Sequence, residues 1–342
     1  MTSSPAAQQV TPRRITQYIF GFAPTFCLEA AIRNRVFDVL DEGPKTLEEV
    51  SRETGASERG LRAIMNLLVG LELLAKDAEG RYSLTPESAA FLVSTKPAFH
   101  GGIFRHASKQ LIPKWLEIDE VVRTGRPAIA VNREAEGSEF FQQFVEDIFS
   151  LSYAAAKKLA EVLKVAEAKT PVRVLDLAAG SGVWGIALAE GAPQVRVTAV
   201  DWPGVLPVTR RVVKRFGLED RYEFIAGDLH EVDFGGGYNV ATLGNILHSE
   251  GEENSRRLLK KTHAALAPGG TIAIQEFLVN HSRAEMDIGL IFAVNMLVNT
   301  DRGDTFSFEE IRGWLREAGF ENVRSVDSPG PSPLILATKT GT

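Results

Sequence analysis

From residue 172 onwards, short apolar segments alternate with helix-like segments, and this alternation constrains the fold more than any other feature. The segments expected to form strands cover 172–178, 195–201, 222–228, 239–246 and 271–277. Helices are expected over 183–190, 204–216, 255–266 and 307–318. Such alternation is typical of a parallel sheet with helices on both faces. We therefore expect an α/β fold with a Rossmann-like, mostly parallel sheet, to which the tail adds a C-terminal antiparallel hairpin at one edge.

A glycine-rich segment joins the first expected strand to the first helix. It runs from Asp176 through Gly180 and Gly182 to Gly185 and contains a GxGxxG pattern. Glycines let the backbone turn sharply and approach a ligand closely. The pattern alone is weak evidence, since it fits a nicotinamide oxidoreductase equally well. The segment therefore indicates a nucleotide-type cofactor without deciding which one.

Residues that follow the later strands narrow the choice. Asp201 ends the second strand, where a carboxylate can accept hydrogen bonds from ribose hydroxyls. Asp228 follows Gly227 at the end of the third strand, and an LxPGG turn, 266–270, precedes the fifth. In this register the acids and glycines resemble those of the class I S-adenosylmethionine-dependent methyltransferases.

That resemblance implies S-adenosylmethionine as the cofactor. It implies that the glycine turn lies beside the methionine moiety, Asp201 binds the ribose, and Asp228 with Leu229 flanks the adenine. No metal is expected. The residues expected to bind the cofactor are Ser152, Asp176, Gly180, Gly182, Asp201, Trp202, Gly227, Asp228, Leu229 and Asn245.

His248 and Glu276 form a candidate catalytic pair. His248 follows the fourth strand, and Glu276 ends the fifth. With the doubly wound strand order 3-2-1-4-5 these strands are neighbours, so both side chains emerge at the same edge of the sheet. A phenol, with a pKa near ~10, is almost entirely un-ionised near neutral pH, so its attack requires a base. We expect His248 to be that base and Glu276 to orient it; a structural histidine at a helix start is the alternative.

Residues 15–100 have the pattern of a winged helix. Thr46 and Glu49 match a capping box, Ser57 is placed to cap a longer helix, and a short hairpin follows. A winged helix raises the alternative of a DNA-binding regulator.

The expected recognition helix argues against DNA binding. Arg59 and Arg62 are its basic groups, and the rest of it is strongly apolar. A helix that binds in a DNA groove needs positive charge facing the phosphates. Packing and homodimerisation are therefore favoured.

Two further segments are candidates for the substrate pocket. Residues 101–154 are expected to be helical and are rich in aromatic residues; core packing is favoured for each one, but as a set they could roof a pocket. The segment 289–300 places several candidates on one helix face, for which a core or dimer face is an equal alternative. The residues expected to line the pocket are Phe144, Phe149, Phe292, Asn295, Met296 and Asn299.

Taken together, these segments resemble the small-molecule O-methyltransferases of the caffeate/hydroxyneurosporene type over nearly the whole chain. The resemblance implies a general base in the segment around His248, Ser152 near the cofactor carboxylate, and dimerisation through the N-terminal domain. It also implies transfer of a methyl group to a hydroxyl of an aromatic or polyketide-like small molecule. The expected domains are a disordered tail (1–14), a winged-helix dimerisation domain (15–100), a helical linker (101–154) and the catalytic domain (155–342).

The sequence departs from this family at two places. The base is commonly followed there by Asp-Trp, whereas Ser249 and Glu250 follow His248 here, so a tryptophan that would cover the adenine is missing. A second flanking acid of the family aligns near Asp304. Methylation of nitrogen, carbon or sulfur, or a non-methylating reaction with the same cofactor, therefore remains an alternative.

Composition limits partners and location. The net charge of -6 gives no overall attraction to nucleic acid or acidic membranes. Cys27 is the single cysteine, which fits a reducing compartment, and the first residues lack the apolar segment of a signal peptide. No apolar run in the sequence approaches the ~18 residues that a membrane helix needs. We expect a cytoplasmic homodimer without nucleic-acid or membrane partners.

Overall fold

The computed structural model describes residues 10–330 and 332–341. It divides into two compact units, residues 1–108 and 109–342, and the division falls inside the segment expected to link the domains. Most of the expected disordered tail, residues 1–9, lies outside the described residues, whereas Arg13 and Arg14 already belong to helix α1 (Arg13–Thr16).

The N-terminal unit is a small helical domain with one hairpin. Its core is formed by buried side chains that include Phe37, Leu61, Met65, Leu68 and Tyr82. Its further elements are η1 (Gln17–Phe20), α2 (Ala23–Arg33), α3 (Val36–Leu40), α4 (Leu47–Thr54), α5 (Glu58–Gly70), β1 (Leu74–Lys76), β2 (Tyr82–Leu84), α6 (Pro86–Phe91) and α7 (Gly102–His106).

Side-chain caps set the helix starts in this unit. Thr46 and Glu49 form the expected capping box at the start of α4, and the hydroxyl of Ser57 accepts a hydrogen bond from the backbone N–H of Gly60 at the start of α5. These bonds satisfy N–H groups that have no partner within the helix. The sequence prediction of both helix starts is confirmed.

The first helical stretch is more apolar than we expected. By length and composition, the 21 residues Arg13–Arg33 could cross a membrane, and 17% of the window that meets this test is buried. The expectation from the sequence that no apolar run approaches the length of a membrane helix is therefore wrong. Exposed apolar side chains on this stretch include Ile15, Ile19 and Phe20.

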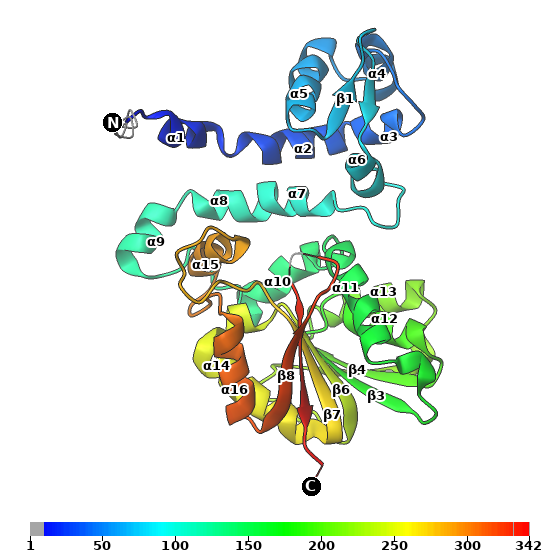
Figure 1. Ribbon diagram of the computed structural model, residues 1–342, viewed down its shortest axis with the longest axis vertical. Helices are drawn as coiled ribbons and strands as arrows, with labels where there is room; N and C mark the ends of the chain where they lie inside the picture. Colours follow the sequence, from blue (N-terminus) through cyan, green and yellow to red (C-terminus); the bar gives the residue numbers. More distant parts are fainter. Residues whose placement is uncertain (1–9, 331, 342) are drawn as a thin grey trace, which may run out of the picture. The chain divides into compact units, whose positions relative to one another are not determined.

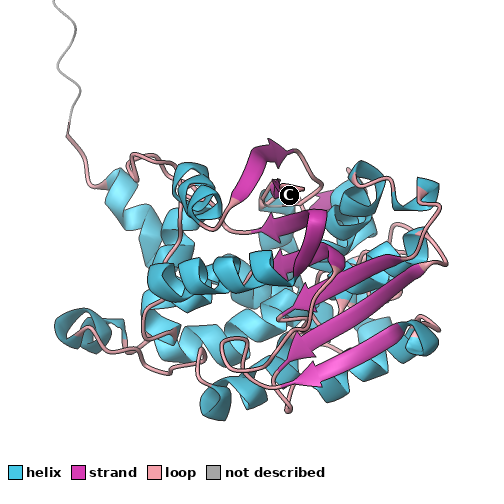
Figure 2. Ribbon diagram, turned by 90° about the horizontal axis from the view of Figure 1, so that it is seen from below, coloured by secondary structure: helices cyan, strands magenta, loops and turns pink. Residues whose placement is uncertain are grey.

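A seven-stranded sheet organises the second unit (Figure 2, magenta). Its strand order, β5-β4-β3-β6-β7-β9-β8, contains the predicted order 3-2-1-4-5, and the first five strands in this order are parallel. The C-terminal hairpin is antiparallel and joins the sheet through β9, beside β7. The strands are β3 (Val172–Leu177), β4 (Val195–Asp201), β5 (Tyr222–Ala226), β6 (Tyr238–Gly244), β7 (Leu266–Gln275), β8 (Phe320–Val326) and β9 (Leu334–Lys339).

Helices cover both faces of this sheet (Figure 1). Val174 and its neighbours on one face pack against α11 (Phe149–Val162), α12 (Val183–Gly191) and α13 (Leu206–Arg215). Leu175 and its neighbours on the other face pack against α14 (Leu247–Ala265) and α16 (Phe308–Glu317). Successive residues of a strand point to opposite faces, so apolar strands without polar alternation bury both faces. The predicted α/β architecture is confirmed.

The remaining helices precede β3 or follow β7. They are η2, a π-helix (Ala107–Leu111), α8 (Ile112–Trp115), α9 (Ile118–Thr124), α10 (Glu134–Phe144), η3 (Val165–Glu167), η4 (Glu219–Arg221) and α15 (Ile288–Asn299).

Helix α14 begins earlier than its apolar pattern predicts. It starts at Leu247 and not at 255, with a kink at Gly251, where φ is 74°. A Cβ at Gly251 would lie 2.4 Å from the carbonyl oxygen of Arg302. The early start places His248 in a helical turn that the chain around Arg302 packs against.

Candidate active site

The glycine turn after β3 is built from left-handed residues. Ala178, Gly180 and Gly182 have φ values of 50°, 54° and 78°, and Gly182 precedes α12 directly. The backbone N–H of Gly180 donates to Asp201 Oδ2 at 2.7 Å, so the turn is tied to the end of β4. The predicted meeting of the glycine turn with Asp201 is therefore seen in the structure.

Asp176 lies beneath this turn and is fully buried. Its Oδ1 accepts a hydrogen bond from the hydroxyl of Thr242 at 2.7 Å, and its Oδ2 accepts one from the N–H of Gly185 at 3.1 Å. Burial raises the pKa of Asp176 to about 7, against the opposing effect of these two donors. Asp176 thus supports the turn from below.

Burial also raises the pKa of Asp201, to about 6. The N–H groups of Gly180 and Trp202 oppose this rise because they donate to its carboxylate, each at 2.7 Å. The two bonds fix the carboxylate at the edge of the sheet and leave further lone pairs on its oxygens.

Asp228 lies close to Asp201 along the same edge. The N–H of Gly227, the residue before Asp228, donates to the carbonyl of Asp201 at 3.0 Å. Oδ1 of Asp228 accepts the N–H of His230 at 2.7 Å, and Leu229 between them is buried. The structure therefore brings together the glycine turn, Asp201 and Asp228.

Helix α10 packs against this edge. A Cβ at Gly137 would lie 2.4 Å from the indole ring of Trp202, and the ring of Phe141 lies 6.0 Å from that ring. Val145, which follows α10, lies beside Gly180. Ser152, the other expected cofactor residue of this region, is buried in α11.

The side chains of His248 and Glu276 meet as predicted. Nδ1 of His248 lies 2.5 Å from Oε1 of Glu276, and the backbone N–H of His248 donates to Oε2 at 3.0 Å. The N–H of Phe277 donates to Oε1 at 3.0 Å. Glu276 is fully buried and His248 is 8% exposed. An ionised carboxylate only accepts, so Nδ1 carries the proton and Nε2 is left as an acceptor.

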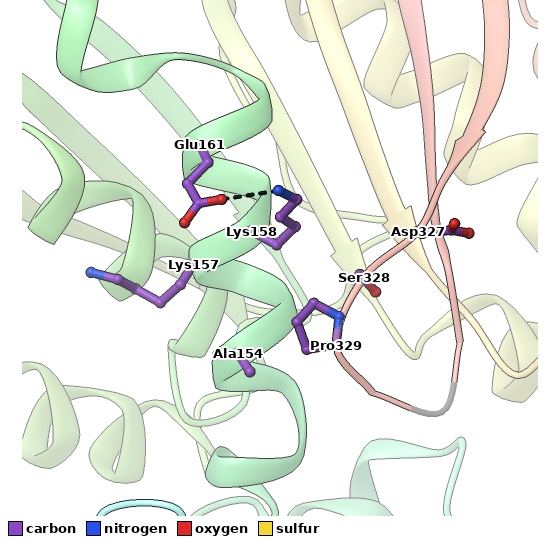
Figure 3. A pocket seen from close by; sticks show the side chains of 7 residues that line it. All are labelled: Ala154, Lys157, Lys158, Glu161, Asp327, Ser328 and Pro329. Carbon is purple, nitrogen blue, oxygen red and sulfur yellow. Dashed lines mark hydrogen bonds and ion pairs between the residues drawn. The ribbon is translucent and has the colours of Figure 1, made fainter.

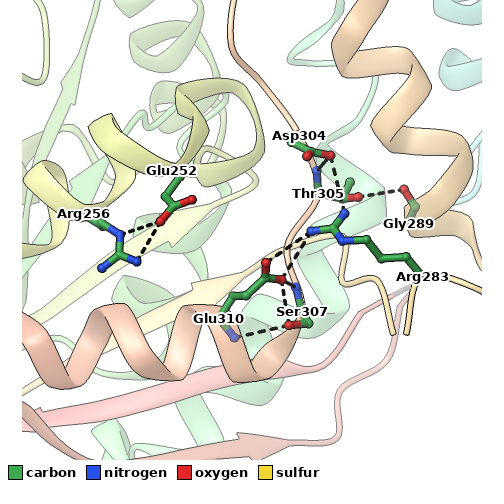
Figure 4. A network of polar contacts seen from close by, with 8 residues as sticks. All are labelled: Glu252, Arg256, Arg283, Gly289, Asp304, Thr305, Ser307 and Glu310. Carbon is green, nitrogen blue, oxygen red and sulfur yellow. Dashed lines mark hydrogen bonds and ion pairs between the residues drawn. The ribbon is translucent and has the colours of Figure 1, made fainter. Parts of the chain in front are cut away.

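Asp304 does not join this pair through its side chain. Its backbone N–H donates to the carbonyl of His248 at 2.9 Å, while its carboxylate lies 3.8 Å from Arg283 (Figure 4). Arg283 also contacts Glu310, which closes a capping box with Ser307 at the start of α16. Of the residues that the structure describes, Glu276 is the one whose carboxylate is bonded to His248.

Aromatic rings surround the imidazole of His248. Phe292 meets it edge-on, with ring centroids 4.9 Å apart, and stacks on Phe277 at 4.1 Å. The predicted pocket residue Phe292 therefore contacts the predicted base.

Asn295 lies one turn further along α15 and is oriented by two donors. Its Oδ1 accepts from the indole N–H of Trp115 and from Nδ2 of Asn299, both at 3.0 Å. Oδ1 of Asn299 is buried without a partner among residues 10–330 and 332–341. Met296 is buried on the same helix.

The two predicted aromatic residues near α11 separate from this group. Phe144 clusters with Phe140 and Phe141, and the latter contacts Trp202, which is one of the residues expected to bind the cofactor. Phe149 packs against Tyr153 and Phe216, beside the core between the sheet and its helices. The six predicted pocket residues thus fall into three clusters.

A shallow groove elsewhere on this unit contains none of the predicted residues. It is lined by α11 and the β8–β9 connection, where Lys158 pairs with Glu161 at 3.0 Å (Figure 3). Its other lining residues are Ala154, Lys157, Asp327, Ser328 and Pro329.

Sequence reasoning missed several supporting contacts. A Cβ at Gly244 would lie 1.9 Å from Nε1 of Trp184, so this glycine makes room for the indole. The Trp115–Asn295 bond and a contact between His230 and Glu250 join segments far apart in the chain. Two local sequence features pointed to these contacts: the GxGVWG motif, which contains Trp184, and the unusual residue Glu250.

Comparison with known proteins identifies the family. A family model described as an O-methyltransferase dimerisation domain matches residues 16–94, and one described as an O-methyltransferase domain matches residues 115–321. A 3-hydroxy-5-methyl-1-naphthoate 3-O-methyltransferase of Streptomyces sahachiroi is 29% identical, covering 96% of this chain and 95% of the relative. The tetracenomycin polyketide synthesis 8-O-methyl transferase TcmO of Streptomyces glaucescens is 28% identical, covering 96% and 97%.

A solved structure shows the same fold. Human N-acetylserotonin methyltransferase in complex with S-adenosylmethionine aligns with a TM-score of 0.82 and 23% identity, covering 99% of this chain and 100% of that one. The alignment includes both units of the chain. With the match of the catalytic family model to most of the second unit, the chain belongs to the O-methyltransferase family and is an S-adenosylmethionine-dependent methyltransferase.

Proposed function

We propose that the enzyme transfers a methyl group to a hydroxyl of an aromatic or polyketide-like small molecule, with His248 as general base. The contact between His248 and Glu276 carries this proposal. Two relatives, one named for a naphthoate and one for tetracenomycin polyketide synthesis, support the substrate class. Methylation of nitrogen, carbon or sulfur is the alternative chemistry.

The protein's part in the reaction is proton removal and alignment. Glu276 accepts Nδ1–H of His248, which fixes the tautomer and leaves Nε2 to take the hydroxyl proton. As positive charge develops on the imidazole, the buried carboxylate stabilises it. The backbone bond from Asp304 to the carbonyl of His248 holds the turn in place. Bound S-adenosylmethionine supplies the activated methyl group.

The residues along the edge of the sheet fit this cofactor. S-adenosylmethionine offers a ribose diol and a positive charge and carries no phosphate. The edge correspondingly presents the carboxylates of Asp201 and Asp228, next to the glycine turn. Ser152, Asp176, Gly180, Gly182, Trp202, Gly227, Leu229 and Asn245 complete the proposed cofactor site.

The surroundings of His248 fit an aromatic acceptor. Phe292 provides an apolar, flat wall next to the imidazole, and aromatic rings pack favourably against such side chains. Nδ2 of Asn295 has no bonding partner within the described part of the chain, while its oxygen is held by Trp115. Asn295 can therefore donate a hydrogen bond to an oxygen of the substrate. Met296 and Asn299, on the same helix, are the further pocket residues of this proposal. Phe144 and Phe149 stay predictions, because they pack in other clusters.

We also propose that the N-terminal unit forms a homodimer, as its family model implies. Ile15, Ile19, Phe20 and Phe22 are 74%, 62%, 69% and 56% exposed, and such a group of exposed apolar side chains is typical of an interface. The match to a dimerisation domain favours packing over DNA binding. Cytoplasmic location stays a prediction, based on the single Cys27.

A substrate screen tests the reaction class directly. The enzyme is incubated with methyl-labelled S-adenosylmethionine and with matched phenol, aniline and thiophenol forms of naphthoate and polyketide scaffolds. Label in the phenols alone supports O-methylation. Label found only in the anilines or only in the thiophenols would show that nitrogen or sulfur, and not a hydroxyl oxygen, accepts the methyl group.

A further inference from the structure

We propose that His230 and Glu250 form the wall at the adenine end of the cofactor site, joined by a hydrogen bond from the neutral imidazole to the carboxylate. This inference rests on the cofactor placement proposed above. It assigns a role to Glu250, which stands where this chain departs from the family it resembles, and to its bonding partner His230.

The side chains of His230 and Glu250 are in direct contact. Nε2 of His230 lies 2.6 Å from Oε2 of Glu250, and the side chains are only 9% and 13% exposed. His230 follows Asp228 by two residues, and its backbone N–H donates to the Asp228 carboxylate. Glu250 follows His248 by two residues. One contact therefore joins the segment proposed to flank the adenine to the turn that carries the proposed base.

A neighbouring arginine sets the tautomer of His230. Nε of Arg257 donates to Nδ1 of His230 at 3.3 Å, so Nδ1 is the acceptor. The ring proton then resides on Nε2 and points to Glu250. A neutral imidazole between a guanidinium and a carboxylate is held in one orientation by both partners.

Helix α14 holds the same segment a second time. Nζ of Lys261, one turn after Arg257, donates to the carbonyls of Leu229 and Val232 at 2.7 and 2.5 Å. Residues four apart lie on one helix face, so Arg257 and Lys261 act on the turn after β5 from the same side. Lys261 thereby ties both ends of that turn to α14.

The chemistry of the pair suits a wall beside a purine. A carboxylate at position 250 cannot stack on adenine as an indole would, but it can hold the planar imidazole of His230 in place. Because the pair is nearly excluded from water, losing either partner leaves the other desolvated and unpaired. The hydrogen bond between His230 and Glu250, and not the charge of the carboxylate alone, therefore holds the imidazole in position at the adenine end of the site.

The test is calorimetric titration of full-length enzyme with S-adenosylhomocysteine and with its N6-methyl derivative. Glu250→Ala should weaken S-adenosylhomocysteine binding about tenfold, because the imidazole of His230 is no longer held in place and must be ordered when the ligand binds. The wall should make the wild type prefer the unmethylated ligand, and Glu250→Ala should reduce that preference because the wall is no longer held close to N6. Glu250→Gln keeps an acceptor oxygen and should stay within about threefold of wild type.

Controls separate this inference from the proposed function. Glu253→Ala removes an acid of the same helix whose side chain is 84% exposed and should bind as wild type. Asp228→Ala should weaken binding; if it does not, the cofactor placement itself is wrong. If Asp228→Ala weakens binding while Glu250→Ala keeps wild-type affinity and N6 preference, the wall is overturned. Should Glu250→Ala fail to fold, His230→Ala takes its place in the same titrations, with the same expected and contradicting results.

Discussion

Glu276 shows how a buried carboxylate can be satisfied without a cation. Three N–H groups, two from His248 and one from Phe277, donate to its oxygens. Hydrogen bonds of this kind offset the cost of burying a carboxylate. Asp176 and Asp201 have fewer compensating donors, and burial raises the pKa of each.

The raised pKa of Asp201 predicts how cofactor affinity depends on pH. The ionised carboxylate is the better acceptor for ribose hydroxyls, and it predominates above the pKa of about 6. Affinity for S-adenosylmethionine should therefore fall as the pH is lowered through 6. Calorimetric titrations over a pH series measure this.

Two variants separate Asp201 from other groups that titrate nearby. Asp201→Asn does not ionise and should lose the part of the pH dependence centred near 6. Asp201→Ala should bind about tenfold more weakly at neutral pH. A pH profile unchanged in Asp201→Asn, or a normal dissociation constant in Asp201→Ala, contradicts the ribose assignment.

The bond between Trp115 and Asn295 predicts an effect on the substrate alone. Trp115→Phe keeps the aromatic packing but removes the donor that orients Asn295, so KM for the acceptor should rise about three- to tenfold. The dissociation constant of S-adenosylmethionine should not change. Leu116→Ala, at a neighbouring residue that is 82% exposed, is the matched control. An unchanged KM in Trp115→Phe would remove Asn295 from substrate recognition.

Side chains that follow predicted strands could be placed from the sequence, whereas contacts between distant segments could not. Strand ends locate Asp201, Asp228, His248 and Glu276 because parallel strands share one carboxyl edge. The partner of Asn295 lies 180 residues away and carries no periodic signal. Phe149 could not be assigned, since an aromatic residue at helical spacing fits a core as well as a pocket.

At the scale of elements, the strand order was predictable and the start of α14 was not. Uniformly apolar strands alternating with helices determine a parallel sheet, and the switch in strand order determines the edge that binds ligands. The residues from Leu247 to Glu252 lack the repeating apolar pattern from which a helix is predicted. Packing of the chain around Arg302 against the kink at Gly251 stabilises that turn instead.

The junction between β6 and α12 predicts a stability effect. Gly244→Ala would place a Cβ against Trp184 at the strand end that leads to His248, and overpacking of this kind costs about 1–3 kcal/mol. Gly313→Ala in α16 meets no atom within 4 Å and should stabilise the protein by about 0.5–1 kcal/mol. Denaturant unfolding of both variants measures the free energies. Equal stability of Gly244→Ala and wild type would show that the indole can move aside.

For the whole molecule, the exposed apolar residues of the first helices predict the oligomeric state. Phe22→Asp places a charge among them and should shift the protein from dimer to monomer in light scattering coupled to size-exclusion chromatography. Thr170→Asp adds the same charge at an exposed position of the other unit and should remain dimeric. A Phe22→Asp protein that stays fully dimeric would place the interface elsewhere.

The most direct test of the catalytic proposal measures binding and turnover in one variant, His248→Ala. Loss of a general base typically costs about 100-fold or more in rate, while Asp201 and Asp228, the carboxylates proposed to bind the cofactor, follow other strands and should be unaffected. We predict unchanged affinity for S-adenosylmethionine and at least about 100-fold slower methyl transfer to an identified acceptor. Methyl transfer at the wild-type rate in His248→Ala would contradict the account.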